Sequence, residues 1–359
     1  MRAELAERAL AAVMDWEEAE VAGRVQQLQA LAGHKYDEYG GYRPGVQFLE
    51  SLTSWLFQFE PARREAAVEF VLRRLVFVSD AEMEHLIAVA YPDVVRPLLA
   101  ARVAEDLGVP GYRIRQITAS TEFCALRRRT LVLGLSDGAR LDRLRRASHE
   151  LSHEQFHLVT TLPQQLVADM RGELRKALDK LGSDAPNTFR HVLLVDDFAG
   201  TGFTLIRKNA GNFEGKLPKH YDELKRLRSE GAVPADVRVT VLLYVASEQA
   251  IAHVESCLRD AGLDWELRVV QRLDSRFRVD RTDPAMIELC RDYYDPVLTD
   301  KHKGDATLGF RDAALPLVLA HNTPNDSICL LWADTTERPE SRCLRALFPR
   351  YERHHPDRP

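Results

Sequence analysis

The chain has 359 residues, a length that accommodates about two domains. Hydrophobic residues make up 45% of it and charged residues 29%, an ordinary globular composition that excludes a wholly disordered chain. The formal net charge of -5 excludes a global positive field for non-specific nucleic-acid binding and leaves only local basic patches open.

The first part of the chain is predicted to be helical. Apolar residues recur at three- and four-residue steps over 48–59 and again over 68–77. Ser79 and Asp80, with acidic residues after them, are typical of a helix start, whereas Val109-Pro110-Gly111 marks a turn. We therefore expect an all-helical N-terminal domain over residues 1–110.

Strands and helices alternate after this turn. Apolar, often β-branched runs predict strands at 130–135, 191–195, 237–245 and 267–270, and the spacing over 166–181 predicts an amphipathic helix. Continuous apolar strands separated by helices are typical of a parallel sheet that is covered on both faces. We expect an α/β domain of this kind, a parallel sheet with flanking helices, over residues 111–340, followed by a C-terminal tail over 341–359.

The segment after strand 191–195 has the composition of an anion-binding loop. It reads Asp196-Asp197-Phe198-Ala199-Gly200-Thr201-Gly202-Phe203-Thr204, and a helix is expected to begin at Leu205-Ile206-Arg207. Its glycines let the backbone approach a ligand, its threonines add hydroxyl groups, and the N-terminus of the following helix attracts phosphate. The two adjacent carboxylates suit hydroxyl groups or a Mg²⁺ ion beside that phosphate. A ribose 5-phosphate satisfies both halves of the loop.

The stretch VLLVDDFAGTGFT resembles the loop that binds phosphoribosyl pyrophosphate (PRPP) in type I phosphoribosyltransferases (PRTases). The resemblance covers roughly residues 120–335 and implies a PRTase-like fold, Mg²⁺ as cofactor, and displacement of pyrophosphate from C1 of PRPP. Asp196 and Asp197 are the implied catalytic residues, which hold the ribose diol and, directly or indirectly, the metal. The implied PRPP-binding residues of this loop are Asp196, Asp197, Ala199, Gly200, Thr201, Gly202, Phe203 and Thr204.

In the same family an earlier loop holds the pyrophosphate. The segment after strand 130–135 occupies the matching place, so the implied residues are Ser136, Asp137, Gly138, Ala139 and Arg140. Asp137 stands where a basic residue is common, which puts ordinary pyrophosphate handling in doubt, and a plain Asp-Gly turn is the alternative. The family also has a mobile loop between the two, and the polar stretch 148–162 is well placed for it.

Residues late in the chain are candidates for the acceptor side. Residues 308–312 are similar to a segment late in purine PRTases, and the strand candidate 315–320 leads into the amide-rich sequence HNTPND at 321–326. The candidates are Asp312, His321, Asn322 and Asn325. A rigid turn is an equal alternative for the HNTPND sequence.

The C-terminal segment 321–332, the PRPP-like loop and the helical N-terminal region together resemble a narrower group. These are PRTase-like proteins of bacterial conflict and antiphage defence systems, some of them associated with retrons. The resemblance implies an effector whose partners are proteins or nucleic acid of such a system. The acceptor and the oligomeric state stay open.

A competing motif lies between the two loops. Residues 149–157 contain HExxH twice, overlapping at His153, and on a helix two such histidines share one face and bind zinc. A third ligand such as Glu173 would be needed, so a zinc peptidase is the third candidate function, with 153–157 as the better copy. Arg127-Arg128-Arg129 forms a further charge run, which is more typical of a solvated face than of a nucleic-acid contact.

The leading hypothesis is thus a PRTase-like protein that transfers phosphoribose from PRPP to an acceptor. The alternative is a nucleotide sensor that binds the same ligand, PRPP or a phosphoribosyl nucleotide, without turnover. No apolar run is long enough to span a bilayer, and the first ten residues do not have the pattern of a secretory signal. We therefore expect a cytoplasmic protein without a membrane partner.

Overall fold

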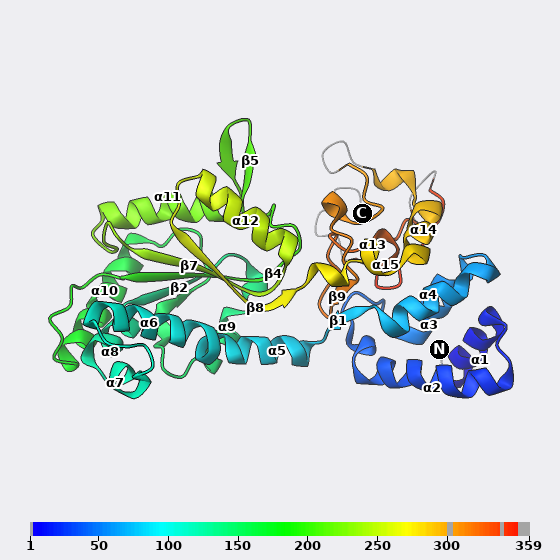
Figure 1. Ribbon diagram of the computed structural model, residues 1–359, viewed down its shortest axis with the longest axis horizontal. Helices are drawn as coiled ribbons and strands as arrows, with labels where there is room; N and C mark the ends of the chain where they lie inside the picture. Colours follow the sequence, from blue (N-terminus) through cyan, green and yellow to red (C-terminus); the bar gives the residue numbers. More distant parts are fainter. Residues whose placement is uncertain (1–2, 300–303, 338–340, 351–359) are drawn as a thin grey trace. The chain divides into compact units, whose positions relative to one another are not determined.

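The computed structural model describes residues 3–299, 304–337 and 341–350, and it divides into two compact units (Figure 1). Unit 1 consists of Met1–Met83 and Asp274–Pro359, and unit 2 consists of Glu84–Leu273. The chain thus begins in unit 1, forms unit 2 and returns to complete unit 1. This arrangement differs from the linear division at residues 110 and 340 expected from the sequence, because the returning segment packs with the N-terminal helices.

Unit 2 is built on a five-stranded parallel sheet with strand order β3-β2-β4-β7-β8. The strand bounds are β2 Thr130–Gly134, β3 Phe156–His157, β4 His191–Ala199, β7 Arg238–Ser247 and β8 Trp265–Leu273. The four predicted strands are confirmed as β2, β4, β7 and β8. The strands β2, β4 and β7 read as near-continuous apolar runs because helices cover both faces of the sheet.

Alternate residues of these strands point to opposite faces. One face carries Leu133, Leu194 and Val241, which pack in one cluster with apolar residues of α10 (Gln164–Lys180), α11 (Lys216–Ser229) and α12 (Glu248–Asp260). In Figure 1, α11 and α12 lie on one side of the sheet and α6 and α9 on the other. The other elements of this unit are η2 Ala90–Val95, α6 Arg96–Leu107, α7 Ile114–Thr118, α8 Thr121–Arg128, η3 Asp137–Ala139, α9 Leu141–Ala147, η4 His153–Gln155, β5 Arg207–Asn209 and β6 Asn212–Glu214, while α5 Asp80–Val89 begins in unit 1 and ends in unit 2.

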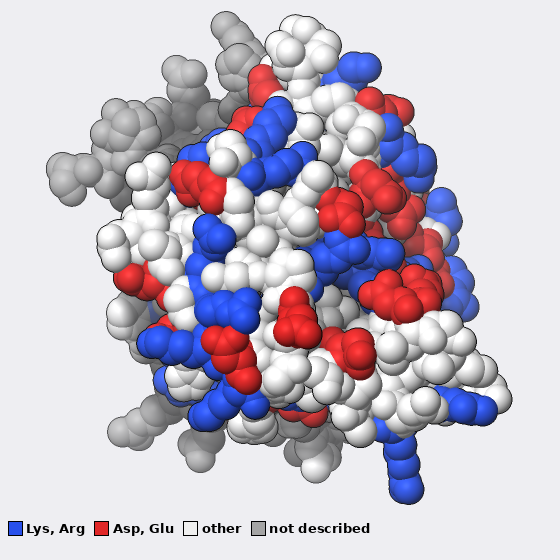
Figure 2. All heavy atoms as spheres, turned by 90° about the vertical axis from the view of Figure 1, so that its left-hand side faces the viewer, with Lys and Arg blue, Asp and Glu red and all other residues white. Residues whose placement is uncertain are grey.

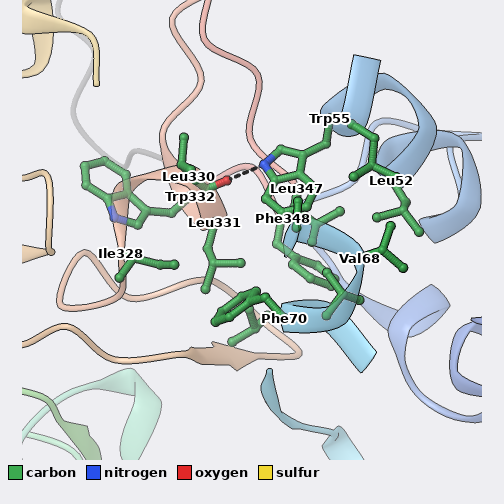
Figure 3. Packing of buried hydrophobic residues seen from close by; sticks show 14 of the residues in the cluster. Leu52, Trp55, Val68, Phe70, Ile328, Leu330, Leu331, Trp332, Leu347 and Phe348 are labelled. Carbon is green, nitrogen blue, oxygen red and sulfur yellow. Dashed lines mark hydrogen bonds between the residues drawn. The ribbon is translucent and has the colours of Figure 1, made fainter. Parts of the chain in front are cut away.

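Unit 1 has its own hydrophobic core, drawn in Figure 3. Trp55, fully buried, donates a hydrogen bond from its indole nitrogen to the carbonyl of Leu330 at 2.9 Å, and Phe348 is buried in the same core. Leu344, Leu347 and Phe348 of the expected tail therefore belong to this core, and residues 351–359 lie outside the described chain. The elements are α1 Ala3–Met14, α2 Glu18–His34, η1 Tyr36–Glu38, α3 Phe48–Phe57, α4 Pro61–Arg73, β1 Val76–Val78, η5 Ser275–Phe277, α13 Val279–Thr282, α14 Pro284–Tyr293, η6 Pro296–Leu298, η7 Phe310–Asp312, β9 Leu317–Leu319 and α15 Cys329–Trp332.

The strand expected at 315–320 is present as β9, but it does not join the large sheet. It pairs in parallel with β1, so that Phe77 lies opposite Val318. The apolar pattern predicted this strand but not its partner, which lies in the region predicted to be helical. Over the described residues, no helix combines the length and the apolarity needed to cross a membrane.

Candidate functional site

Two loops meet where the connections of the unit 2 sheet diverge. Strands β2 and β4 are neighbours, with Gly134 opposite Val195, and the N–H of Leu135 extends the pairing to the Val195 carbonyl at 2.8 Å. After β2 the chain continues to the edge strand β3, whereas after β4 it continues to β7 on the other side. Ligands of parallel sheets bind beyond the strand ends at such a switch point. The loop 136–140 begins there, and so does the segment 196–206, whose first four residues are the last residues of β4.

The first acid of the pair, Asp196, is buried at this point with only 1% of its side chain exposed. Ser136 donates its hydroxyl to Oδ1 at 2.5 Å, and Lys216 places its Nζ 2.5 Å from Oδ2. A buried carboxylate needs such partners because desolvation otherwise costs several kcal/mol. The structure thus joins a residue of the pyrophosphate-like loop directly to the acid pair. Lys216, at the start of α11, was not among the residues predicted from the sequence.

The second acid, Asp197, is half-buried and faces the same loop. Its Oδ1 accepts the N–H of Phe198 at 2.8 Å, and a Cβ added at Gly138 would lie only 2.5 Å from its Oδ2. No side chain larger than hydrogen fits at position 138 without moving that carboxylate. Gly138, named from the sequence as a pyrophosphate-loop residue, thus lies against the second acid of the pair.

A buried tyrosine supports the loop 136–140 from below. The hydroxyl of Tyr244, on β7, donates to the carbonyl of Ala139 at 2.8 Å. Burial raises the pKa of this phenol, and the nearby carboxylates of Asp197 and Asp196 raise it further, so it stays a neutral donor. The next residue, Arg140, has a φ of 45°, the left-handed conformation that ends the short 3₁₀ turn η3.

The PRPP-like loop closes on itself through backbone hydrogen bonds. The carbonyl of Gly202 accepts the N–H groups of Leu205 and Ile206 at 3.0 and 3.1 Å. Gly202 has a φ of 77°, and a Cβ there would lie 2.8 Å from the Val254 side chain of α12. A left-handed backbone pressed against a helix requires glycine. The second glycine of the motif is thus explained by packing as well as by ligand access.

The aromatic residue of the loop is held by α12. The Phe203 ring stacks on His253 with centroids 4.1 Å apart and planes at 13°. The Nε2 of His253 lies 2.9 Å from the carbonyl of Ile206, so the imidazole also contacts the end of the loop. The loop therefore rests on α12 along much of its length.

The helix expected from Leu205 to Arg207 is absent. An antiparallel hairpin, β5 with β6, begins instead at Arg207, which lies opposite Glu214. The next helix, α11, begins only at Lys216. Ala210 and Gly211 have positive φ angles at the hairpin tip, a turn geometry that joins strands. The prediction of a helix N-terminus directly after Thr204 was therefore wrong, and this source of phosphate-binding N–H groups is lost.

The acceptor-side candidates belong to unit 1. Asp312 ends the 3₁₀ turn η7, and the N–H of Asn322 donates to the Leu319 carbonyl at 3.0 Å, which makes a tight turn after β9. The Asn325 carbonyl accepts the N–H of Phe310 at 2.7 Å. This segment has the geometry of an ordered turn, and the acceptor role of Asp312, His321, Asn322 and Asn325 stays a prediction.

The polar stretch 148–162 is tied to the sheet edge. Within it, β3 pairs with β2 in parallel, and the N–H of Leu162 donates to Glu223 of α11 at 2.8 Å. Gln155 is buried and donates to the carbonyl of Thr130 at 2.6 Å. The segment named as a mobile lid candidate thus contains a two-residue edge strand and is anchored to β2 and α11, and its mobility stays a prediction.

The zinc motif in this stretch does not form a metal-binding helix. His153–Gln155 is a 3₁₀ turn and His157 lies on β3, so the two histidines do not share a helical face. Nε2 of His157 contacts the Glu154 carbonyl at 2.8 Å, and that glutamate pairs with Arg128. The prediction of a helix over HExxH at 153–157 was wrong: Ser152 and Gln155 form a capping box, but the turn that it starts ends at Gln155, because Phe156 is extended and enters β3.

The arginine run 127–129 lies on a mixed-charge face. Arg127 pairs with Glu150 at 2.9 Å, and Arg129 donates to the carbonyl of Thr188 at 2.8 Å. Figure 2, which shows the α8 and α10 end of unit 2, has Lys and Arg side chains interspersed with Asp and Glu. The solvated, ion-paired interpretation of this run is favoured over a nucleic-acid patch.

The acid pair fits a metal ion only in combination with a ligand. Among the residues that the structure describes, no group of three or more His, Cys, Asp or Glu side chains is placed to hold a metal. Both oxygens of Asp196 already have partners in Ser136 and Lys216. Mg²⁺ retains waters and is commonly bound by one or two carboxylates plus substrate phosphates. The residues fit a Mg²⁺ ion that arrives on a phosphorylated ligand and contacts Asp197 directly or through water.

Comparison with protein families places most of the chain in a known family. A family model described as PRTase-CE matches residues 52–350, most of the chain and parts of both units. Among curated proteins and among solved structures, nothing matches. The matched range contains the two loops at the switch point.

Proposed function

This chain belongs to the PRTase-CE family of phosphoribosyltransferase-like proteins, and on that premise we propose that unit 2 binds PRPP, or a related ribose 5-phosphate, beyond the ends of β2 and β4. The observation that carries the proposal is the contact between two separately predicted loops: Ser136 with Asp196 at 2.5 Å, and Gly138 against the carboxylate of Asp197. A ligand spanning both loops presents a pyrophosphate to one and a ribose 5-phosphate to the other.

Each part of the site has a role in this proposal. The loop 199–204 binds the 5-phosphate through its N–H groups and the threonine hydroxyls. Asp197 holds the ribose diol, while the buried Asp196 fixes the position of the loop 136–140 through Ser136. Residues 136–140 contact the pyrophosphate. The Asp137 carboxylate repels this negatively charged group unless a cation binds with it.

The proposed reaction is a displacement at C1 of the ribose. A lone pair of the acceptor forms a bond to C1, the C1–O bond breaks, and pyrophosphate leaves with that electron pair while the acceptor loses a proton. The ribose ring carries positive charge in the transition state, so a fixed carboxylate such as Asp197 stabilises it electrostatically. When bound, Mg²⁺ supplies positive charge to the leaving pyrophosphate.

The resemblance to PRTase-like proteins of conflict and antiphage systems supports a proposal for the cellular role of the protein. We place the protein as an effector of such a system, with phosphoribosyl transfer to a base, nucleotide, RNA or protein side chain as its output. Unit 1 has its own hydrophobic core, and we propose that partner proteins or nucleic acid bind to the surface of this unit.

A sensor without turnover is the second candidate. One observation favours it: Asp137 stands in the pyrophosphate loop where a basic residue is common. This acid weakens the handling of a highly charged leaving group compared with an ordinary transferase. A bound phosphoribosyl nucleotide would then be read out by a partner.

Titration calorimetry of the full chain with PRPP, with and without Mg²⁺, tests the shared part of both functions. We expect saturable binding that Mg²⁺ strengthens, and no binding under either condition would contradict both. Pyrophosphate release on incubation with PRPP and candidate acceptors separates them. Release supports the transferase, and tight binding without release across bases, nucleotides and RNA supports the sensor.

A further inference from the structure

The lysine beside the acid pair is positioned by its backbone as well as by its charge. Lys216 is the first residue of α11; its N–H donates to the carbonyl of Thr204 at 3.1 Å, and its own carbonyl accepts from Nδ1 of His220 at 3.0 Å. These two bonds fix its Cα between the end of the PRPP-like loop and the first turn of the helix. Its side chain, 32% exposed, then reaches from the surface to the buried Asp196.

The ion pair joins a partly exposed lysine to a buried carboxylate, and this difference in exposure matters for metal binding. Asp196 is almost completely buried, and its remaining oxygen accepts from Ser136, so the lysine is the cation that the structure gives to this carboxylate. Ammonium and Mg²⁺ are both compact, strongly hydrated cations that neutralise a carboxylate. Two adjacent acids at a strand end would otherwise attract a free divalent cation.

We propose that Lys216 is the resident counter-ion of the acid pair and keeps free Mg²⁺ out of the site until a phosphorylated ligand brings it. This rests on the proposed function for the identity of the ligand, and not for the ion pair itself. Lys216 is a positioning residue, because it acts through Asp196. If Lys216 acts in this way, the protein binds Mg²⁺ only together with the phosphorylated ligand.

Thermal unfolding with and without MgCl₂, in the absence of PRPP, tests the inference. We expect no effect of Mg²⁺ on the Tm of the wild type. Lys216→Met should unfold at a lower temperature than the wild type and regain about 2–4 °C with millimolar Mg²⁺, since the ion replaces the lost charge. Lys216→Arg, which keeps the charge, should behave as the wild type.

Two controls identify the site of the effect. Lys219, exposed on the same helix, provides the matched variant Lys219→Met, for which we expect no change with Mg²⁺. The double variant Lys216→Met/Asp196→Asn should lose the Mg²⁺ response, because the carboxylate that binds the ion is gone. A Mg²⁺ response of the wild type equal to that of Lys216→Met, or none in either, would overturn the inference.

A second measurement decides the matter if Lys216→Met does not fold. Reductive methylation followed by mass spectrometry compares the reactivity of Lys216 with that of Lys219 in the wild type and in Asp196→Asn. We expect Lys216 to react several-fold more slowly than Lys219 in the wild type and at a similar rate in Asp196→Asn. If Lys216 reacts as fast as Lys219 in the wild type as well as in Asp196→Asn, Lys216 is not the counter-ion of Asp196. Neither measurement contains PRPP, so a failure to bind PRPP would count against the proposed function and leave this test intact.

Discussion

At the scale of single residues, the site depends on a few short contacts between its two loops more than on the number of its polar groups. Gly138 has no room for a Cβ because the Asp197 carboxylate lies against it, and Asp196 is held from two sides by Ser136 and Lys216. Such packing fixes two carboxylates in a defined geometry before a ligand arrives. Preorganised charges of this kind cost no rearrangement during reaction.

Gly138→Ala is expected to lower PRPP affinity by at least about tenfold, because the new methyl group displaces Asp197 from its position. Calorimetry with PRPP and Mg²⁺ measures the change. Gly172→Ala is the matched control: nothing lies within 4 Å of a Cβ at that position of α10, so affinity should not change and stability should rise slightly. Equal affinities of Gly138→Ala and the wild type would show that the loop 136–140 does not contact the ligand.

At the scale of elements, the sequence predicted what long apolar runs determine and missed what short-range turns determine. Strands β2, β4, β7 and β8 follow from their apolar runs, and α10 follows from its amphipathic period. The hairpin after Thr204 could not be foreseen, since Leu205-Ile206-Arg207 has helix-compatible residues and only the positive φ of Ala210 and Gly211 turns the chain back. Lys216 was missed for the same reason, because its role depends on where α11 begins.

The segment 153–157, wrongly predicted to be a zinc-binding helix, contains a residue on which stability should depend. Gln155 is buried and donates to the carbonyls of Arg127 and Thr130 at 2.9 and 2.6 Å, while its Oε1 accepts the N–H of Ser152 at 2.8 Å. Gln155→Ala removes three hydrogen bonds to the backbone, one buried and two part-buried, and should lower the free energy of unfolding by about 2–4 kcal/mol. Denaturant unfolding measures the loss.

The control for this prediction is His153→Ala, an exposed residue of the same turn, for which we expect a change within about 0.5 kcal/mol. A zinc-binding helix would give the opposite ranking, with His153→Ala more damaging than Gln155→Ala and stoichiometric zinc in the purified protein. That ranking would contradict the 3₁₀ turn and edge strand described here.

At the scale of the whole molecule, the chain folds as two units that are not consecutive in sequence. The pattern over 315–320 predicts a strand, but nothing in it tells that β9 pairs with β1 and not with the central sheet. Pairing between distant segments depends on tertiary packing, which a local pattern does not contain. The family match over 52–350 is informative here because it covers segments of both units.

Two buried histidines and one half-buried histidine of unit 2 predict how stability depends on pH. Burial lowers the pKa of His191, His220 and His157 below the usual 6.5, and for His191 the charges of Arg102 and Arg238 lower it further. The unfolded chain takes up these protons near pH 6.5 and the folded protein only at lower pH. Stability is therefore fully present above about pH 6.5 and falls below it, by up to about 1.4 kcal/mol per pH unit for each histidine that stays neutral.

Chemical denaturation between about pH 7.5 and about pH 5.5 measures this slope. His191→Gln removes one titrating group and should give a shallower slope than the wild type. A stability that is constant or increases as the pH falls through this window would contradict the described burial of these side chains.

The central claim is that the acid pair at the switch point holds a phosphorylated ribose. Calorimetric titration with PRPP and Mg²⁺ of the wild type and of Asp196→Asn/Asp197→Asn, with circular dichroism to show that both are folded, tests it most directly. Charge-assisted hydrogen bonds contribute about 1.5–3 kcal/mol each, so the double variant should bind PRPP roughly tenfold to a hundredfold more weakly, or worse. Mg²⁺-dependent PRPP binding of equal strength in the two folded proteins would contradict the account.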